Sequence, residues 1–170
     1  IAARIGPDQA RIAAILLLTL RGTPTLYYGD EIGLGHVPIP PERVQDPWER
    51  NEPGHGRDPE RTPMQWDDGD NAGFSDAEPW LPLSNDYRTR NVDSLRDASG
   101  SILTLYRILL ALRREHAALA EGAYRTCQEG VDGVFAYERY DAVATFRIVL
   151  NFTDEDRICA LPDGAAWTVL

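Results

Sequence analysis

One short stretch, Gly22–Gly33, constrains the fold more than any other part of the chain; it reads Gly-Thr-Pro-Thr-Leu-Tyr-Tyr-Gly-Asp-Glu-Ile-Gly. Its centre, Thr25–Tyr28, is β-branched and aromatic and is bounded by turn residues, so it predicts one short buried strand. Since one strand cannot form a sheet, we expect its neighbours upstream of Ile1. A strand that ends in acidic residues and leads into a long loop is typical of the active-site end of an α/β barrel.

Helical patterns flank this stretch on both sides. The first predicted helix begins at Pro7 and runs to about Leu20. Its part from Ile12 to Leu18 is apolar all round, so we expect it to be buried on more than one side. A second, amphipathic helix is predicted later in the chain, with a serine cap and an end at Gly122.

The segment from Leu34 to about Gly100 shows little periodicity. It holds nine of the 12 prolines and three of the 4 tryptophans of the chain. Disordered segments are poor in aromatic residues, and ordered loops of this length are usually functional. We therefore expect an ordered, functional loop, with one short helix near Pro41–Val44.

From Ala123 onward the pattern predicts short strands separated by turns. The β-rich runs are Thr126, Val134–Tyr137, Val143–Val149 and Trp167–Val169. Strands spaced by roughly ten residues are typical of an antiparallel sandwich. The expected fold class is α/β plus all-β: residues 1–122 form the C-terminal part of a (β/α)8 TIM barrel, and residues 123–170 form a truncated, partial antiparallel β-sandwich domain.

The charge of the chain is acidic. A formal net charge of −10 and a pI of about 4.7 argue against a nucleic-acid partner and against an anionic membrane surface. The longest apolar run is far shorter than the roughly 20 residues that span a bilayer, and the first residues lack a signal-peptide pattern, although the true N-terminus is expected to lie upstream of Ile1. A cytoplasmic location is expected. The three histidines and two cysteines match no metal or redox spacing, and no metal or cofactor is expected.

Two groups of residues are candidates for chemistry. Asp30 and Glu31 follow the predicted strand, where barrel sites lie. Adjacent residues of an extended strand point to opposite faces, so these two carboxylates are not expected to act as an acid and nucleophile pair. Arg57 and Arg61 lie in an acidic, Trp-containing segment. Their guanidinium groups suit either a polar ligand or a loop held by Arg–Asp pairs, and their spacing alone favours neither.

Long motifs in the chain resemble glycoside hydrolase family 13, the α-amylase family. One of them is Ala10–Gly33, ARIAAILLLTLRGTPTLYYGDEIG, which is similar to the seventh helix and eighth barrel strand of that family. A second similar run is Gly56–Ser75, GRDPERTPMQWDDGDNAGFS, followed by Pro79–Leu83, PWLPL. It resembles the segment after the eighth strand in the family's α-glucosidase and oligo-1,6-glucosidase branch, and in related trehalose- and sucrose-acting enzymes. A strand and turn of its C-terminal β-domain resemble Leu150–Asp156, LNFTDED.

The resemblance implies a retaining α-glycosidase that hydrolyses short α-glucosides, with an oligosaccharide as substrate. Such enzymes use an Asp nucleophile, a Glu acid/base and a second Asp. In the family these lie on the fourth, fifth and seventh strands, the last in an Asn-His-Asp motif that we expect a few residues before Ile1. The chain is therefore expected to be a fragment without catalytic residues, inactive on its own. The alternatives are a glucosyl-transferring isomerase, forming trehalose or isomaltulose, and a non-catalytic, transporter-associated heavy chain.

The resemblance also assigns roles within the loop. Arg57 and Arg61 match the two arginines of the family's loop after the eighth strand, and Arg61 is the stronger candidate for a contact to substrate hydroxyls. Asp58, Gln65 and Trp66 are expected to shape the loop. Arg139, in the β-rich part, is expected to be an exposed arginine.

Overall fold

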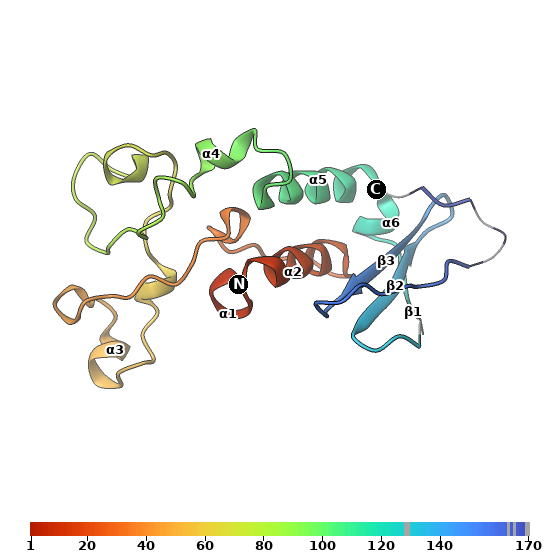
Figure 1. Ribbon diagram of the computed structural model, residues 1–170, viewed down its shortest axis with the longest axis horizontal. Coiled ribbons are helices and arrows are strands. Elements are labelled where there is room, and N and C mark those ends of the chain that lie inside the picture. Colours follow the sequence, from red (N-terminus) through yellow and green to blue (C-terminus); the bar gives the residue numbers. More distant parts are fainter. Residues whose placement is uncertain (128–129, 163, 165, 169–170) are drawn as a thin grey trace.

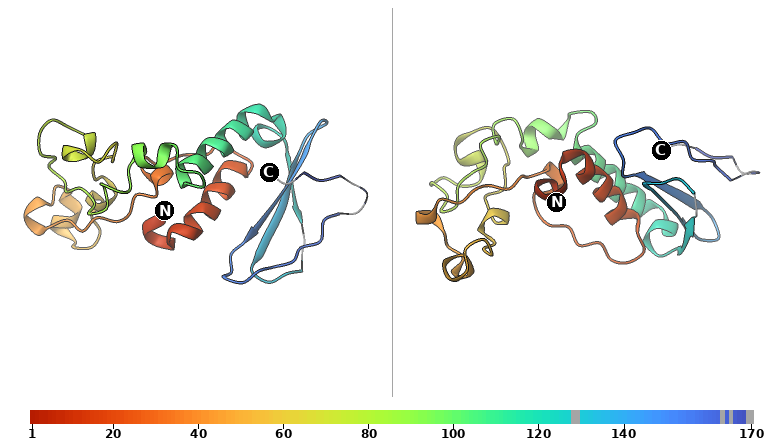
Figure 2. Two further views of the ribbon diagram at one scale, coloured as in Figure 1. Left: turned by 45° about the horizontal axis from the view of Figure 1, so that its top comes forward. Right: turned by 60° about the horizontal axis from the view of Figure 1, so that its bottom comes forward.

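The computed structural model describes residues 1–127, 130–162, 164 and 166–168. Figure 1 shows an elongated molecule in which two roughly parallel helices form the middle, a small sheet forms one end and a lobe of loops forms the other. The two turned views in Figure 2 keep this arrangement. The N-terminus lies where the helices meet the loop lobe.

The two predicted helices are present and pack on each other, but the predicted end of the second at Gly122 is wrong, because the extended backbone of His116 ends it at Glu115. Helix α2 spans Pro7–Thr19 after the short α1 (Ala2–Ile5), and α5 spans Ile102–Glu115. The Ser101 hydroxyl accepts a hydrogen bond from the Thr104 N–H at 3.0 Å and so caps α5. The contact between the helices is apolar, and its buried members are Ala14, Leu18, Tyr106 and Leu109.

The expected buried strand at Thr25–Tyr28 is wrong. The segment lies outside every helix and strand, and the side chains of Leu26, Tyr27 and Tyr28 are 41%, 49% and 41% exposed. A strand requires a neighbour for its backbone N–H and C=O groups. None of the described segments pairs with Thr25–Tyr28, so its β-forming residues remain without a sheet. It leads into a 3₁₀ turn, η1, at Asp30–Ile32.

The long loop is ordered by short helical pieces. Its α-helices are α3 (Pro47–Asn51) and α4 (Val92–Arg96), and its 3₁₀ turns are η2 (Pro41–Arg43), η3 (Asp58–Glu60) and η4 (Asp70–Gly73). The turn η2 lies where the short helix near Pro41 was predicted. Within the described part of the chain, no helix is both long and apolar enough to cross a membrane.

A single three-stranded antiparallel sheet forms the C-terminal part. Its strands are β1 (Ala123–Cys127), β2 (Val134–Tyr140) and β3 (Thr145–Asn151), in the order β1-β2-β3. The fourth predicted strand is wrong at Trp167 and Thr168, which belong to no strand, while Val169 lies outside the described residues. The described residues therefore form one sheet and not a sandwich, because no second sheet faces it.

One face of the sheet packs on the helices. The short helix α6 (Ala117–Ala120) contributes Leu119 to a core with Tyr137, Ile148 and Leu150. Helix α2 adds Leu16 and Leu20 to this same core. The sheet is thus attached to the helical part by a shared apolar contact, and the division into two domains after residue 122 stays a prediction.

The expected exposure of Arg139 is also wrong, because its side chain is 0% exposed. Its guanidinium donates to the carbonyl of Thr19 at 2.7 Å and to that of Gly122 at 3.1 Å. Arg113 donates to the carbonyls of Leu18 and Leu20 at 2.9 and 3.2 Å. Two arginines therefore bind carbonyls at the C-terminal end of α2, where the helix leaves acceptors unpaired and its dipole is negative.

The neighbouring Glu138 points to the opposite face of β2, as the two-residue period of a strand requires. Its carboxylate is 4% exposed and accepts hydrogen bonds from Arg125 Nε at 3.1 Å and from Arg147 at 2.9 Å. Burial acts against the charged carboxylate, but the hydrogen bonds from Arg125 and Arg147 outweigh it and lower the pKa of Glu138.

The stability of the sheet is therefore expected to depend on pH through Glu138. Because its folded-state pKa lies below the ordinary 4.5, the stabilisation is present above about pH 4.5 and is lost as the pH falls through the folded pKa. We expect Glu138→Gln to lower the free energy of unfolding by about 2 kcal/mol at pH 7 and by less near pH 3. Urea unfolding at both pH values measures this; an equal loss at both would contradict it.

Candidate functional site

The loop lobe is cross-linked by carboxylates that accept backbone N–H groups. Asp58, which is buried, accepts from the Gln45 and Asp46 N–H groups at 2.6 and 2.8 Å. The Glu49 carboxylate accepts from the N–H groups of Gly54 and Gly56, each within 2.9 Å. Charged acceptors of this kind make strong hydrogen bonds, which explains how a segment without a sheet is held in one conformation. The predicted structural role of Asp58 is confirmed.

Arg57 is part of this cross-linking. Its Nε donates to Asp46 Oδ2 at 2.9 Å, and its backbone N–H donates to the same oxygen at 3.0 Å. Asp46 also accepts from the Trp48 N–H at 2.9 Å and so caps α3. The hydrogen bond from the Arg57 guanidinium is the main reason why the pKa of Asp46 lies well below its usual range. The loop-holding interpretation therefore applies to Arg57, whose guanidinium is nonetheless half exposed.

Arg61 differs from Arg57. Its side chain is exposed, and it forms no hydrogen bond or ion pair with any residue in the described ranges. Its backbone N–H donates to the Asp58 carbonyl at 2.9 Å, which places Arg61 directly after η3. Burial raises the pKa of Tyr28 and the positive charge of Arg61 opposes that rise, so the two side chains are close enough to interact. The Arg61 guanidinium is available to a ligand near Tyr28.

A cleft of about 170 Å³ is lined by Glu60, the residue before Arg61, while Arg61 itself is not part of the lining. It forms where the segment before η1, the N-terminal residues and η3 come together; its lining includes Ile1, Arg4, Tyr27, Tyr28, Asp30, His36 and Glu60. The Tyr28 hydroxyl donates to the Thr62 carbonyl at 3.0 Å, which joins the cleft wall to the Arg61 loop. Carboxylates, an imidazole and two tyrosine rings in one concave surface suit a polar ligand that also has an apolar face.

Asp30 and Glu31 have different positions in this cleft. Asp30 lines it and accepts a hydrogen bond from the Ile1 amine at 2.9 Å, whereas Glu31 does not line it. Both residues belong to η1 and not to an extended strand, so their separation comes from the turn and not from the pleat. Burial and the nearby negative charges of Asp30 and Glu31 raise the pKa of Tyr106 to about 12.

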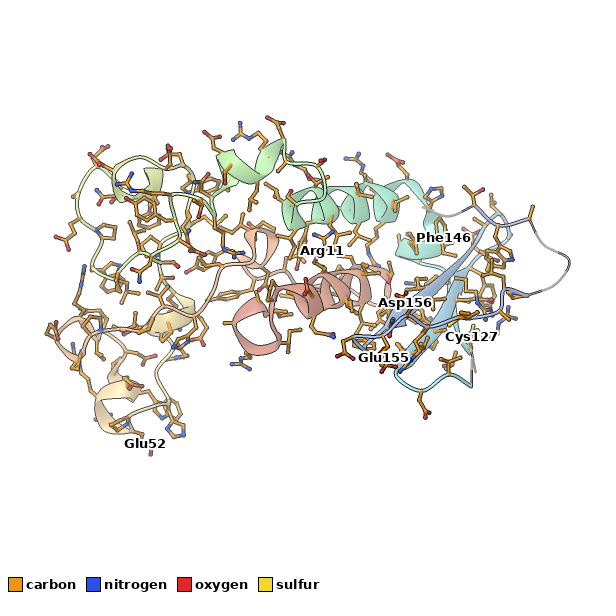
Figure 3. The ribbon with its side chains drawn as sticks, in the orientation of Figure 1. Arg11, Glu52, Cys127, Phe146, Glu155 and Asp156 are labelled. Atoms are coloured by element: carbon orange, nitrogen blue, oxygen red, sulfur yellow. The ribbon has the colours of Figure 1, made fainter. Side chains whose placement is uncertain are left out.

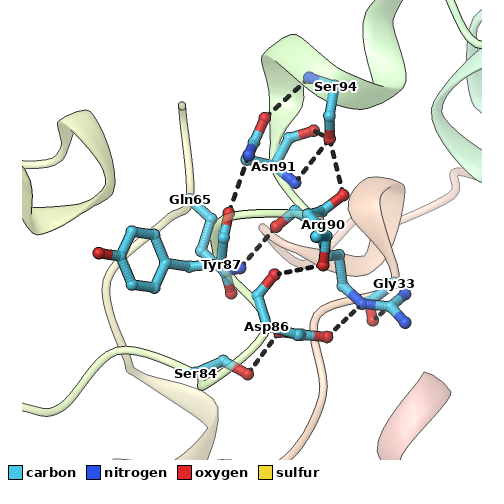
Figure 4. A network of polar contacts seen from close by, with 9 residues as sticks. Gly33, Gln65, Ser84, Asp86, Tyr87, Arg90, Asn91 and Ser94 are labelled. Atoms are coloured by element: carbon cyan, nitrogen blue, oxygen red, sulfur yellow. Dashed lines mark hydrogen bonds and ion pairs between the residues drawn. The ribbon is translucent and has the colours of Figure 1, made fainter. Parts of the chain in front are cut away.

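A polar network fixes the Arg61 loop against η1 (Figure 4). Arg90 donates from Nε to Asp86 Oδ2 at 2.7 Å and from Nη1 to the Gly33 carbonyl at 3.3 Å. The fully buried Gln65 donates to the Arg90 carbonyl at 2.5 Å, and Ser84 donates to Asp86 Oδ1 at 2.6 Å. Gly33 ends η1 and Gln65 follows Arg61 by four residues, so the network connects both walls of the cleft. The predicted loop-shaping role of Gln65 is confirmed.

Trp66 is held by a left-handed turn in η4. Asn71 and Ala72 have φ angles of 52° and 56°, which are unusual for residues other than glycine. The Ala72 carbonyl accepts hydrogen bonds from the N–H groups of Trp66 and Asp67 at 2.8 and 3.3 Å. The turn thus fixes the Trp66 backbone while its indole stays half exposed.

Several cleft residues were not anticipated. The sequence predicts a buried strand for Tyr27 and Tyr28, gives His36 no role, and singles out Glu60 only as part of the acidic segment around Arg57 and Arg61. The signal that could have identified the tyrosines is their position directly before the loop that follows the predicted strand, because barrel sites are built where strands lead into such loops. Nothing in the local pattern distinguishes His36 or Glu60 from other polar loop residues.

Comparisons with known proteins agree with this geometry. Residues 1–122 match the family described as "Alpha amylase, catalytic domain". The oligo-1,6-glucosidase of Parageobacillus thermoglucosidasius is 32% identical over 176 residues, which is 92% of this chain and 31% of that enzyme. An α-glucosyl transfer enzyme, XgtA, has a similar structure with a TM-score of 0.85 and 35% identity over 96% of this chain and 31% of its own.

A further similar structure is that of the trehalulose synthase MutB from Pseudomonas mesoacidophila MX-45. Its TM-score is 0.81 at 32% identity, and the match covers 96% of this chain and 34% of that one. The chain thus spans about a third of the length of the relatives it matches.

Proposed function

Because this chain belongs to the alpha-amylase family, we propose that the protein containing it is a retaining α-glycosidase that acts on short α-glucosides. The observation that carries the proposal is the unpaired, exposed Arg61 beside a cleft lined by tyrosine rings and carboxylates. A neutral sugar needs directional donors and acceptors for its hydroxyl groups, and the Arg61 guanidinium supplies several donors in one plane. Arg61 is proposed as a substrate contact, while Arg57 is proposed to act mainly by holding the loop.

The catalytic acids are proposed to precede Ile1. Ile1 and Asp30 both line the cleft, which supports a catalytic motif near this end of the chain. We propose that the isolated chain of 170 residues is inactive towards p-nitrophenyl α-glucoside.

Product analysis with the full-length protein tests the proposed function. Isomaltose, maltose, sucrose and trehalose are incubated with the protein, and products are separated by anion-exchange chromatography. We expect glucose from isomaltose or maltose as the main product, because water enters the cleft once the first product leaves. A full-length protein that releases no glucose from any of the four sugars would contradict the proposal, and one that also forms no isomer of them would point to a non-catalytic relative.

Glucosyl transfer is the second candidate activity. It is favoured by the likeness to XgtA, which is an α-glucosyl transfer enzyme, and to the trehalulose synthase MutB. Both hydrolysis and transfer can begin with the same covalent glycosyl-enzyme and differ in the acceptor that attacks it. In the same incubation, an isomer of sucrose or of maltose that forms faster than free glucose assigns the protein to transfer.

A cytoplasmic location stays a prediction.

A further inference from the structure

A second cavity lies on the outer side of the loop lobe. Its volume is about 310 Å³, and it is lined by Asp46, Pro47, Trp48, Asn51, Glu52 and Arg57. Figure 3 shows Glu52 at the outer edge of the lobe, near α3 and far from the sheet residues Phe146 and Cys127. One 3₁₀ turn, η3, separates Arg57 from Glu60, which lines the cleft. The two cavities are therefore neighbours along the same loop.

The cavity presents one face of α3. Trp48 and Asn51 are three residues apart and so lie on the same side of the helix, and Glu52 follows directly after its last residue. The Trp48 indole is half exposed, and its Nε1 donates to Glu52 Oε2 at 3.3 Å. This hydrogen bond limits the rotation of the indole and leaves its flat apolar surface beside polar groups.

The opposite wall of the cavity is charged but internally neutralised. The Asp46 side chain is 1% exposed and is paired with Arg57, which is itself 57% exposed and retains donors that the pair does not use. Glu49 points away from this wall and binds the return loop through Gly54 and Gly56. The Arg57 guanidinium is thus fixed in position before any ligand arrives, which reduces the entropy cost of binding.

We propose that this cavity is an outer subsite for a pyranose ring of an oligosaccharide whose reacting end lies in the cleft. A sugar ring combines an apolar C–H face, which fits the Trp48 indole, with hydroxyls that can bond to Asn51, Glu52 and Arg57. Anionic ligands are disfavoured because two carboxylates and only one guanidinium line the cavity. The inference rests on the proposed function and adds that substrates longer than a disaccharide gain affinity.

The test compares substrates of two lengths in the full-length protein. We expect Trp48→Ala to lower the ratio of kcat/KM for isomaltotetraose to that for p-nitrophenyl α-glucoside by about tenfold, because only the longer substrate reaches the indole. The control is Trp80→Ala, since Trp80 is also exposed, at 66%, but does not line the cavity. An unchanged ratio in Trp48→Ala, or an equal fall in Trp80→Ala, would overturn the proposal.

A binding measurement separates this inference from the activity. Intrinsic tryptophan fluorescence is titrated with isomaltotriose and, separately, with tetramethylammonium, in the wild type and in Trp48→Ala. We expect saturable quenching by the sugar in the wild type and its loss in Trp48→Ala, even if the protein hydrolyses nothing. Quenching by tetramethylammonium but not by the sugar would mean a cation site and would overturn the sugar assignment.

Discussion

In the full-length protein, Arg61→Ala is expected to lower kcat/KM for isomaltose by about 100-fold, because charged hydrogen bonds to substrate hydroxyls are lost. The Arg61 guanidinium is exposed, lies near Tyr28 and bonds to none of the side chains that the structure describes, so its removal leaves the loop intact. Arg61→Lys should recover part of the activity, since an ammonium keeps the charge but not the planar donor set.

The matched control for Arg61 is Arg114→Ala. Arg114 is 81% exposed on α5, whereas Arg139 is buried and unsuitable for this purpose. We expect Arg114→Ala to retain the kcat/KM of the wild type, and both variants to unfold at the same urea concentration as the wild type. Equal activity of Arg61→Ala and Arg114→Ala would remove Arg61 from the site.

Arg139→Ala is expected to cause the largest loss of stability in the chain, about 3 kcal/mol in the free energy of unfolding. The change leaves the carbonyls of Thr19 and Gly122 without their donor and opens a cavity between α2 and the sheet. The guanidinium of Arg139 donates to carbonyls, and burial together with the nearby charges of Arg113 and Arg21 lowers its pKa. Urea unfolding followed by circular dichroism measures the loss.

Arg139→Met separates the two contributions to that loss. Methionine fills much of the volume but donates no hydrogen bond, so its variant should lie between the wild type and Arg139→Ala. Arg114→Ala again serves as the control and should change stability by less than about 0.5 kcal/mol. A loss for Arg139→Ala no greater than for the control would mean that the three carbonyl contacts, to Thr19, Gly122 and Ala123, contribute nothing to the junction.

Local signals in the sequence predicted the helices well, and non-local pairing explains the main failures. Helix α2 was located by Pro7 and its apolar pattern, and both features act within one turn or two. The prediction of a strand at Thr25–Tyr28 failed, because its residues prefer a sheet but a sheet needs a partner segment. The burial of Arg139 was missed for a related reason. The carbonyls that bind it belong to Thr19 and Gly122, and both residues are distant from Arg139 in the sequence.

The candidate site was predicted as a segment but not as a geometry. The sequence identified Arg57 and Arg61 together and left ligand binding and loop holding equally open. The structure separates them, because Asp46 lies 11 residues before Arg57 and no spacing rule connects the two. The contribution of Tyr28 and Glu60 to one cleft likewise depends on the path of the loop, which is set by hydrogen bonds from carboxylates to backbone groups.

We propose that this chain forms part of a site that cleaves α-glucosides with retention. Proton NMR of p-nitrophenyl α-glucoside hydrolysis by the full-length protein tests this most directly, because this substrate releases a single glucose whose anomeric signals are resolved before mutarotation. We expect α-glucose to appear first and β-glucose only later, through mutarotation. Initial release of β-glucose would show inversion and would contradict the proposal.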